Sequence, residues 1–236
     1  MKINIKRESV AEYDVNIDGA TLLEVLNEIK RSQDQSLAYS SGCRSGVCGS
    51  CAVRVNGREV LACSHHAKDG DLVEPLRNTP VLRDLVVDMD KAYSFNAKAK
   101  AWQSSLAEGV ELSIENQHIN ELQSDCILCA SCYSACPVYA VNSEFLGPFS
   151  LTRIWRYVSD KREADPKSKI DAVQTNGVWD CTLCNECTLV CPQGISSKAD
   201  IEKLRAKSFM FGYMDPSFTN LGGGFGGGFN DGSPVF

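Results

Sequence analysis

The chain has 236 residues, of which 43% are hydrophobic and 23% are charged, and its formal net charge at pH 7 is −6. This length suffices for two ordinary soluble domains. The negative charge gives no reason to expect a nucleic-acid partner, because phosphate binding needs a clustered basic surface. No run approaches the roughly 18 consecutive apolar residues of a membrane span, and the polar start is unlike a signal peptide. We therefore expect any membrane association to come through a partner.

The first part of the chain, residues 1–95, has the pattern of a small α/β domain. Lys2–Arg7 and Tyr13–Ile17 alternate with period two, which predicts two half-buried strands. Thr21 is a favourable helix N-cap and precedes apolar residues at helical spacing, so we expect a helix to begin at Leu22.

A hairpin is expected in the same domain. Asn56-Gly57 accepts positive φ at both residues and therefore predicts a tight turn between strands at Ala52–Val55 and Glu59–Ala62. Leu72–Glu74 is expected to form the last strand before Pro75.

Residues 96–208 are expected to form a helical domain, after a connector that starts near Pro80 and is rich in Asp, Lys and Ala. Pro148 suits the first turn of a helix that runs through Ile154, Trp155 and Val158, with Lys161-Arg162 near its end. The basic residues around Asp165-Pro166 are expected to form the solvated face of a loop; they are Lys161, Arg162, Lys167 and Lys169.

The segment 209–236 has a different composition, with long glycine runs that cannot sustain a helix. One interpretation is a flexible terminus. The other is an arm whose aromatic side chains dock on a partner subunit, and the residues concerned are Phe218, Phe225, Phe229 and Phe236.

Twelve cysteines are the unusual part of the composition. A secreted chain would use them for disulfides, but this chain starts without a signal peptide and is too large to need such cross-links. Nearly all of them lie in tight C-x2-C spacings, which indicates metal ligation.

The first group of cysteines has the C-x4-C-x2-C…C spacing of plant-type [2Fe–2S] ferredoxins, and its members are Cys43, Cys48, Cys51 and Cys63. An anionic thiolate cluster needs backbone N–H donors and little side-chain bulk around it, which suits a loop rich in glycine. A zinc site fits poorly, because zinc ribbons pair two short C-x2-C knuckles. His65 and His66 could indicate a Rieske centre, but the four cysteine positions are already filled.

Two further groups repeat the bacterial ferredoxin spacing C-x2-C-x2-C-x3-C-P, in which the fourth cysteine of each run ligates the other cluster. The first predicted [4Fe–4S] cluster takes Cys126, Cys129, Cys132 and Cys191. The second takes Cys136, Cys181, Cys184 and Cys187. This crossed ligation predicts that cluster assembly and folding of the helical half are coupled.

The order of these elements resembles the iron–sulfur subunit of succinate dehydrogenases and fumarate reductases. The resemblance rests on the motif from Cys43 to Cys51, on the connector Val81–Asp88, on both Cys-Pro runs and on Leu146-Gly147-Pro148. It implies an α+β protein, with an N-terminal β-grasp plant-type ferredoxin domain followed by an α-helical bacterial-type ferredoxin domain. It also implies a flavoprotein partner that carries the FAD and the dicarboxylate site.

Three positions depart from the usual family pattern. Most members have a [3Fe–4S] centre as the last cluster, because they lack a cysteine at the position of Cys184. The usual quinone-site tryptophan would fall near Val141, and the usual histidine is Thr182. These departures resemble the atypical branch of the family, in which a cysteine-rich subunit similar to heterodisulfide reductase replaces the haem-bearing membrane anchor.

The expected function is therefore electron relay between the flavoprotein and a cysteine-rich or haem-binding membrane-associated subunit, at the cytoplasmic face of the cell membrane. Relay for a heterodisulfide-, glycolate- or glycerol-phosphate-type flavoenzyme is one alternative, and an iron–sulfur redox sensor is another. The sequence contains no nucleophile–base pair, phosphate loop or nucleotide fingerprint, so it predicts no catalytic residues.

Overall fold

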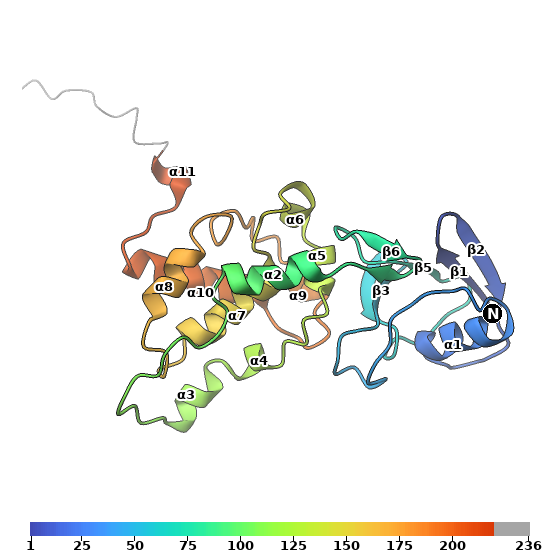
Figure 1. The fold of residues 1–236 in the computed structure, drawn as a ribbon, viewed down its shortest axis with the longest axis horizontal. Helices are drawn as coiled ribbons and strands as arrows, with labels where there is room; N and C mark the ends of the chain where they lie inside the picture. The colour runs from blue at the N-terminus through green and yellow to red at the C-terminus, as the bar shows by residue number, and fades with distance from the viewer. Residues whose placement is uncertain (220–236) are drawn as a thin grey trace, which may run out of the picture.

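A computed structural model describes residues 1–219 of the chain. Figure 1 shows a small sheet with one helix at one end of the molecule and a group of helices at the other, joined by the green connector. This arrangement agrees with the predicted change from a mixed α/β part to a helical part.

The N-terminal part is a five-stranded sheet in the order β2-β1-β5-β3-β4. β1 and β5 are parallel, and the other neighbouring strands are antiparallel. The strands are β1 (Lys2–Lys6), β2 (Val10–Asp14), β3 (Ala52–Val55), β4 (Arg58–Leu61) and β5 (Leu72–Glu74). The predicted turn at Asn56-Gly57 is confirmed, since both residues have positive φ, of 50° and 85°.

The predicted strand at Tyr13–Ile17 was placed too late, since β2 ends at Asp14. The register explains the difference. Lys2, the first residue of β1, pairs with Asp14, and Val15 then exchanges hydrogen bonds with Met1, which precedes β1. Beyond that point β1 offers no backbone groups with which the chain could continue a ladder.

The helix α1 (Leu22–Ser32) begins where the sequence predicts. The Thr21 hydroxyl accepts from the Glu24 N–H, and the Glu24 carboxylate accepts from the Thr21 N–H, which is a capping box. The apolar face of the helix is buried in the core of this domain through Leu22, Leu23, Val25, Leu26 and Ile29.

The connector is more structured than its composition suggests. It contains the short strands β6 (Val81–Arg83) and β7 (Val86–Val87) and then helix α2 (Asp90–Lys98). The predicted domain boundary between residues 95 and 96 falls inside α2, and the division into 1–95, 96–208 and 209–236 stays a prediction.

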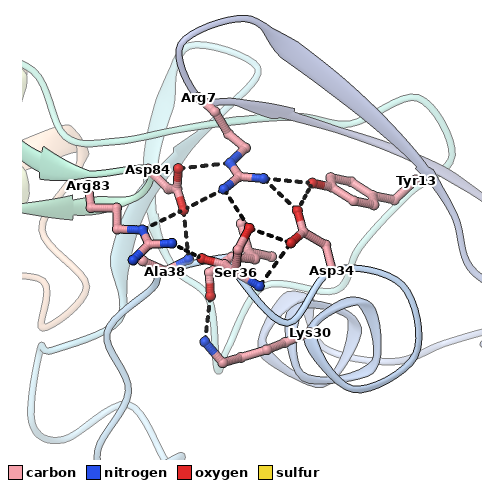
Figure 2. A network of polar contacts seen from close by, with 9 residues as sticks. Arg7, Tyr13, Lys30, Asp34, Ser36, Ala38, Arg83 and Asp84 are labelled. Atoms are coloured by element: carbon pink, nitrogen blue, oxygen red, sulfur yellow. Dashed lines mark hydrogen bonds and ion pairs between the residues drawn. The ribbon is translucent and has the colours of Figure 1, made fainter.

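An ionic network attaches the connector to the N-terminal domain (Figure 2). The Arg7 guanidinium contacts the carboxylates of Asp34 and Asp84, which come from the segments after α1 and between β6 and β7. Asp84 also accepts from the Ala38 N–H at 2.8 Å, and the Tyr13 hydroxyl donates to Asp34 at 2.8 Å. Segments separated by up to 77 residues therefore meet around one guanidinium.

The C-terminal part consists of short helices around two longer ones, α7 (Pro148–Val158) and α10 (Ser197–Met210). The predicted start at Pro148 is confirmed, but the helix ends at Val158, before Lys161-Arg162, where its end was expected. The shorter helices are α3 (Ile114–His118), α4 (Glu121–Ser124), α5 (Ser131–Ser134), α6 (Pro137–Val141), α8 (Pro166–Ala172) and α9 (Glu186–Leu189). The ring of Tyr133 packs against Phe149 with centroids 4.5 Å apart and against Tyr139 at 4.8 Å, which gives this half an aromatic core.

The prediction that Lys169 lies on a solvated face is wrong. Its side chain is fully buried and forms an ion pair at 3.2 Å with Glu163, which is also fully buried. The Lys169 ammonium further donates to the carbonyl oxygen of Trp102 and to the Ser104 hydroxyl, at 2.5 and 2.6 Å. Local sequence could not reveal this, because these partners lie about 65 residues earlier in the chain.

Helix α10 continues past Phe209, where the tail was expected to begin, and α11 (Pro216–Thr219) follows it. Phe218 is exposed. Phe225, Phe229, Phe236 and the glycine runs lie outside the described residues. Across residues 1–219, no helix combines the length and the apolar character needed to span a bilayer.

Candidate iron–sulfur cluster sites

The loop from Cys43 to Cys51 directs backbone N–H groups at sulfur. Cys43 Sγ accepts from the N–H groups of Ser45, Val47 and Cys48, at 3.4, 3.3 and 3.3 Å. The Gly46 N–H donates to Cys63 Sγ at 3.3 Å, and this bond ties the loop to the hairpin that carries the fourth cysteine. Such donors stabilise negative charge on sulfur.

The environment of the cysteines in this loop fits an anionic cluster. The Ser45 N–H, with further donors, lowers the pKa of Cys43 to about 6, which favours the thiolate that ligates iron. Gly42 has no room for a side chain, because a Cβ there would lie 2.9 Å from Cys48 Sγ. Cys43 and Cys48 are exposed, whereas Cys51 and Cys63 are buried. The donor set and the bare backbone suit a [2Fe–2S] cluster at the surface.

The second and third cysteine runs have the same backbone shape. Leu128 and Ala130 have φ values of 54° and 59°, two and four residues after Cys126. Leu183 and Asn185 have φ values of 56° and 72°, at the same offsets from Cys181. Left-handed conformations are costly for residues other than glycine, so their recurrence at matched positions indicates one loop design used twice. Cys184 is the counterpart of Cys129.

The four cysteines predicted for each cubane line a single cavity. One cavity is bordered by Cys126, Cys129, Cys132 and Cys191, and Phe149 and Thr152 also line it. A second cavity is bordered by Cys136, Cys181, Cys184 and Cys187, with Phe145 and Ile201 beside them. Each fourth cysteine thus lies in the cavity of the other run, as crossed ligation requires.

The cavity walls suit bound iron rather than free thiolates. Burial raises the pKa of Cys132 well above its ordinary value and the pKa of Cys187 to about 12. A cationic iron centre offsets the cost of burying thiolates. Across residues 1–219, no three His, Cys, Asp or Glu side chains converge closely enough to hold a single metal ion. A cluster cage needs a wider spacing, because sulfide ions separate its cysteine ligands.

The two halves of the chain meet beside the first cubane cavity. A Cβ built on Gly49 would lie 2.8 Å from both Cys129 Cβ and the Ile127 carbonyl oxygen, so the [2Fe–2S] loop touches the ligand loop of this cavity. The Gln193 side chain donates to the Gly46 carbonyl oxygen at 3.0 Å. At these contacts the two cysteine loops are separated by little more than their own backbone atoms.

Buried polar contacts also hold the two halves of the chain close together. The Ser134 hydroxyl donates to Glu59 at 2.7 Å, and both side chains are buried. The Asn78 side-chain amide faces the carbonyl oxygens of Tyr133, Ser134 and Cys136, at 3.0 to 3.3 Å. Sequence reasoning missed Gln193 and Asn78, because no local pattern shows that an amide will meet a distant backbone.

The other positions discussed from sequence lie outside the two cavities or at their edges. His65 is half-buried near Asp71, and His66 is exposed. Val141 is 88% exposed, and Thr182 borders the second cavity. Cys184 is an exposed cysteine, so the second cavity reaches the surface there.

Comparisons with known proteins agree with this arrangement. The family model "2Fe-2S iron-sulfur cluster binding domain" matches residues 2–94, and "4Fe-4S dicluster domain" matches residues 122–195. The iron–sulfur subunit of 8-methylmenaquinol:fumarate reductase from Wolinella succinogenes is 38% identical over 212 residues. The match covers 84% of this chain and 66% of that protein, so the chain spans about two thirds of it.

Two further comparisons cover nearly whole chains. The fumarate reductase iron–sulfur subunit of Haemophilus influenzae is 33% identical over 231 residues, which are 88% of this chain and 90% of that one. A chain of the Mycobacterium smegmatis Sdh1 complex in the apo form has a TM-score of 0.79 and 25% identity, with 90% of this chain and 97% of that chain covered. The expected fold class is confirmed. The chain belongs to the iron–sulfur subunits of the fumarate reductase and succinate dehydrogenase family, the electron-transfer subunits of these oxidoreductases.

Proposed function

We propose that this chain relays single electrons between the FAD of a flavoprotein subunit and a quinone-side, membrane-associated subunit. The observation that carries the proposal is the alignment of three cysteine sites. The surface loop of Cys43 and Cys48 touches the first cubane cavity through Gly49, and the helices α5 and α9 join that cavity to the second. Iron–sulfur clusters supply one-electron chemistry when bound, and this chain positions and insulates them.

The proposed ligands are the twelve cysteines. Cys43, Cys48, Cys51 and Cys63 hold the [2Fe–2S] cluster. Cys126, Cys129, Cys132 and Cys191 hold the first [4Fe–4S] cluster, and Cys136, Cys181, Cys184 and Cys187 hold the second. The matched backbone at Leu183 and Leu128 supports Cys184 as a true fourth ligand. A [3Fe–4S] centre in the last position is the alternative.

The partner subunits follow from the same proposal. FAD belongs to the flavoprotein alone, and the membrane-side partner is a cysteine-rich or haem-binding subunit. The chain then lies peripherally on the membrane, at its cytoplasmic face. Among the described residues, Val141 and Thr182 offer neither an indole nor an imidazole near the last site, which supports quinone binding by the partner subunit.

Purification of the native complex without oxygen tests the relay. We expect a FAD-containing subunit to copurify, and the bound flavin and the clusters to be reduced together by succinate or by a quinol. Purification of the chain free of any flavoprotein, with one labile cluster, would instead support a redox sensor.

Cysteine variants test the ligand assignment. Mössbauer and EPR spectra of the native protein should show one [2Fe–2S] and two [4Fe–4S] centres. Cys184→Ser should convert the last centre to [3Fe–4S] and leave the first cubane intact. Cys129→Ser, at the matched position, should affect the first cubane only. A stoichiometric [3Fe–4S] centre in the undamaged native protein would refute the role of Cys184.

A further inference from the structure

Three buried polar side chains meet between helices α4, α7 and α10, close to the first cubane cavity. They are Gln123, Thr152 and Asp200, with exposed fractions of 6, 1 and 1%. Thr152 also lines the cavity, and so does Ser197, three residues before Asp200. The iron–sulfur ligation described above uses none of these three side chains.

The hydrogen bonds of this group are incomplete. The Gln123 side-chain N–H donates to Asp200 Oδ1 at 2.8 Å. Within the described part of the chain, Gln123 Oε1, Asp200 Oδ2 and Thr152 Oγ1 make no hydrogen bond of ordinary geometry, although Thr152 still lowers the pKa of Asp200 weakly. An unpaired buried polar atom is destabilising, so the group favours a protonation state that pairs these three atoms.

A proton on Asp200 provides hydrogen-bond partners for these atoms. With Asp200 ionised, the Thr152 hydroxyl is the one donor available to two buried acceptors, Asp200 Oδ2 and Gln123 Oε1. With Asp200 neutral, its own O–H adds the second donor. A carboxylic acid and a primary amide are complementary, since each offers one donor and one acceptor. Protonation of Asp200 therefore adds the donor that lets each of the three unpaired atoms take part in a hydrogen bond.

The charged groups around Asp200 are compatible with reversible protonation of its carboxylate. Gln123 on α4 and Thr152 on α7 are not titratable. Lys203, one turn along α10, is the charged side chain that faces Asp200, with 3.8 Å between Nζ and Oδ1. Burial raises the pKa of Asp200 to about 6, against the opposing effects of Gln123, Lys203 and Thr152. Lys203 is half exposed and provides a route to solvent.

We propose that Asp200 is a redox-linked proton-binding site for the cluster held in the cavity of Cys126, Cys129, Cys132 and Cys191. The inference rests on the proposed function. When an electron from the flavoprotein side arrives in the cavity, the added negative charge favours the neutral form of Asp200. One proton from solvent then binds Asp200 Oδ2, and it returns to solvent when the electron moves on. No other reactant is consumed.

Redox titration of the native complex, followed by EPR at several values between about pH 5 and 8, tests the coupling. In the wild type, the midpoint potential of the first cubane should fall as pH rises above about 6. Asp200→Asn keeps the shape and the amide pairing but cannot titrate. Its potential should be independent of pH and close to the wild-type value at low pH. Asp215→Asn, at a half-buried carboxylate that lines neither cavity, should behave as the wild type.

Infrared difference spectra of the wild type give a second measurement that needs no variant to fold. Reduction of the cubane near neutral pH should produce a protonated carboxyl band, and Asp200→Asn should lack it. A pH-independent wild-type potential, or a slope retained by Asp200→Asn, would overturn the coupling. Iron analysis separates the two proposals. If the cubane is absent, the proposed function fails, and if it is present with a flat potential, only this inference fails.

Discussion

Gln193 and Gly46 are 147 residues apart in the sequence, yet the Gln193 side chain donates to the Gly46 carbonyl oxygen across 3.0 Å. The N–H of the same glycine donates to Cys63 Sγ, and Gln193 follows Cys191 by two residues. One glycine thus connects Cys63, a proposed ligand of the [2Fe–2S] cluster, with the segment that follows Cys191, a proposed ligand of the first cubane. The distance between the two sites depends on this connection and on the contact at Gly49.

Gln193→Leu should loosen the junction without emptying either site. The loss of one hydrogen bond costs about 1 kcal/mol, and the gap between the two cysteine loops should widen. We expect weaker enhancement of the [2Fe–2S] electron-spin relaxation by the reduced neighbouring cluster, measured by pulsed EPR. Gln33→Leu removes a similar bond, to the Asp14 carbonyl at 2.7 Å, far from the junction. It should leave the relaxation unchanged, and equal effects of both variants would contradict the role of Gln193.

Gly49→Ala should separate the halves more strongly. The new Cβ would meet Cys129 Cβ and the Ile127 carbonyl oxygen at 2.8 Å, in a residue whose φ is +72°. Gly19 has a similar φ, +70°, but a Cβ added there has no atom within 4 Å, so Gly19→Ala serves as the control. It should therefore lose only the roughly 1–2 kcal/mol of left-handed strain. Iron content and denaturant unfolding measure the difference, and Gly49→Ala should lose first-cubane iron and more stability than the control.

The buried ion pair of Lys169 and Glu163 should be costly to break from one side. Lys169→Met leaves a buried carboxylate without its cation, at a cost of about 3–5 kcal/mol. Adding Glu163→Gln should recover part of this loss, because the uncompensated charge is then removed. Lys167→Met breaks only the exposed pair with Asp171, and it should leave stability nearly unchanged. Urea unfolding checks all three variants, and a small effect of Lys169→Met would contradict the burial.

The network around Arg7 should make the stability of the protein depend on pH in the acidic range. The hydroxyls of Ser36 and Tyr13, together with Arg7, lower the pKa of Asp34 from 3.8 to about 2. The stability contributed by ionised Asp34 is therefore full above about pH 3.8 and is lost as pH falls toward 2.

Asp34→Asn tests this expectation. It should destabilise the protein at neutral pH, and its difference from the wild type should shrink as pH falls through that window. Thermal unfolding at several pH values measures the difference. Asp14→Asn, on an exposed strand residue, serves as the control. A destabilisation by Asp34→Asn that stays constant down to pH 2 would show that the carboxylate charge is unimportant.

Local chemistry in the sequence determined the three cysteine runs, the helix capped by Thr21, the turn at Asn56-Gly57 and the helix that starts at Pro148. Each of these depends on residues close together in the chain, so spacing and residue type suffice to predict them. The same spacing indicated three clusters and, through the family resemblance, an electron-relay subunit.

Only the tertiary structure decided which side chains serve the sites from a distance. The bond from Gln193 to Gly46, the bonds from buried Lys169 to Trp102 and Ser104, and the bond from Gln123 to Asp200 each join segments that are far apart in sequence. The end of β2 likewise depends on where β1 begins. A charged or amide side chain has the same local signature whether it meets water or a buried partner, and packing alone makes that difference.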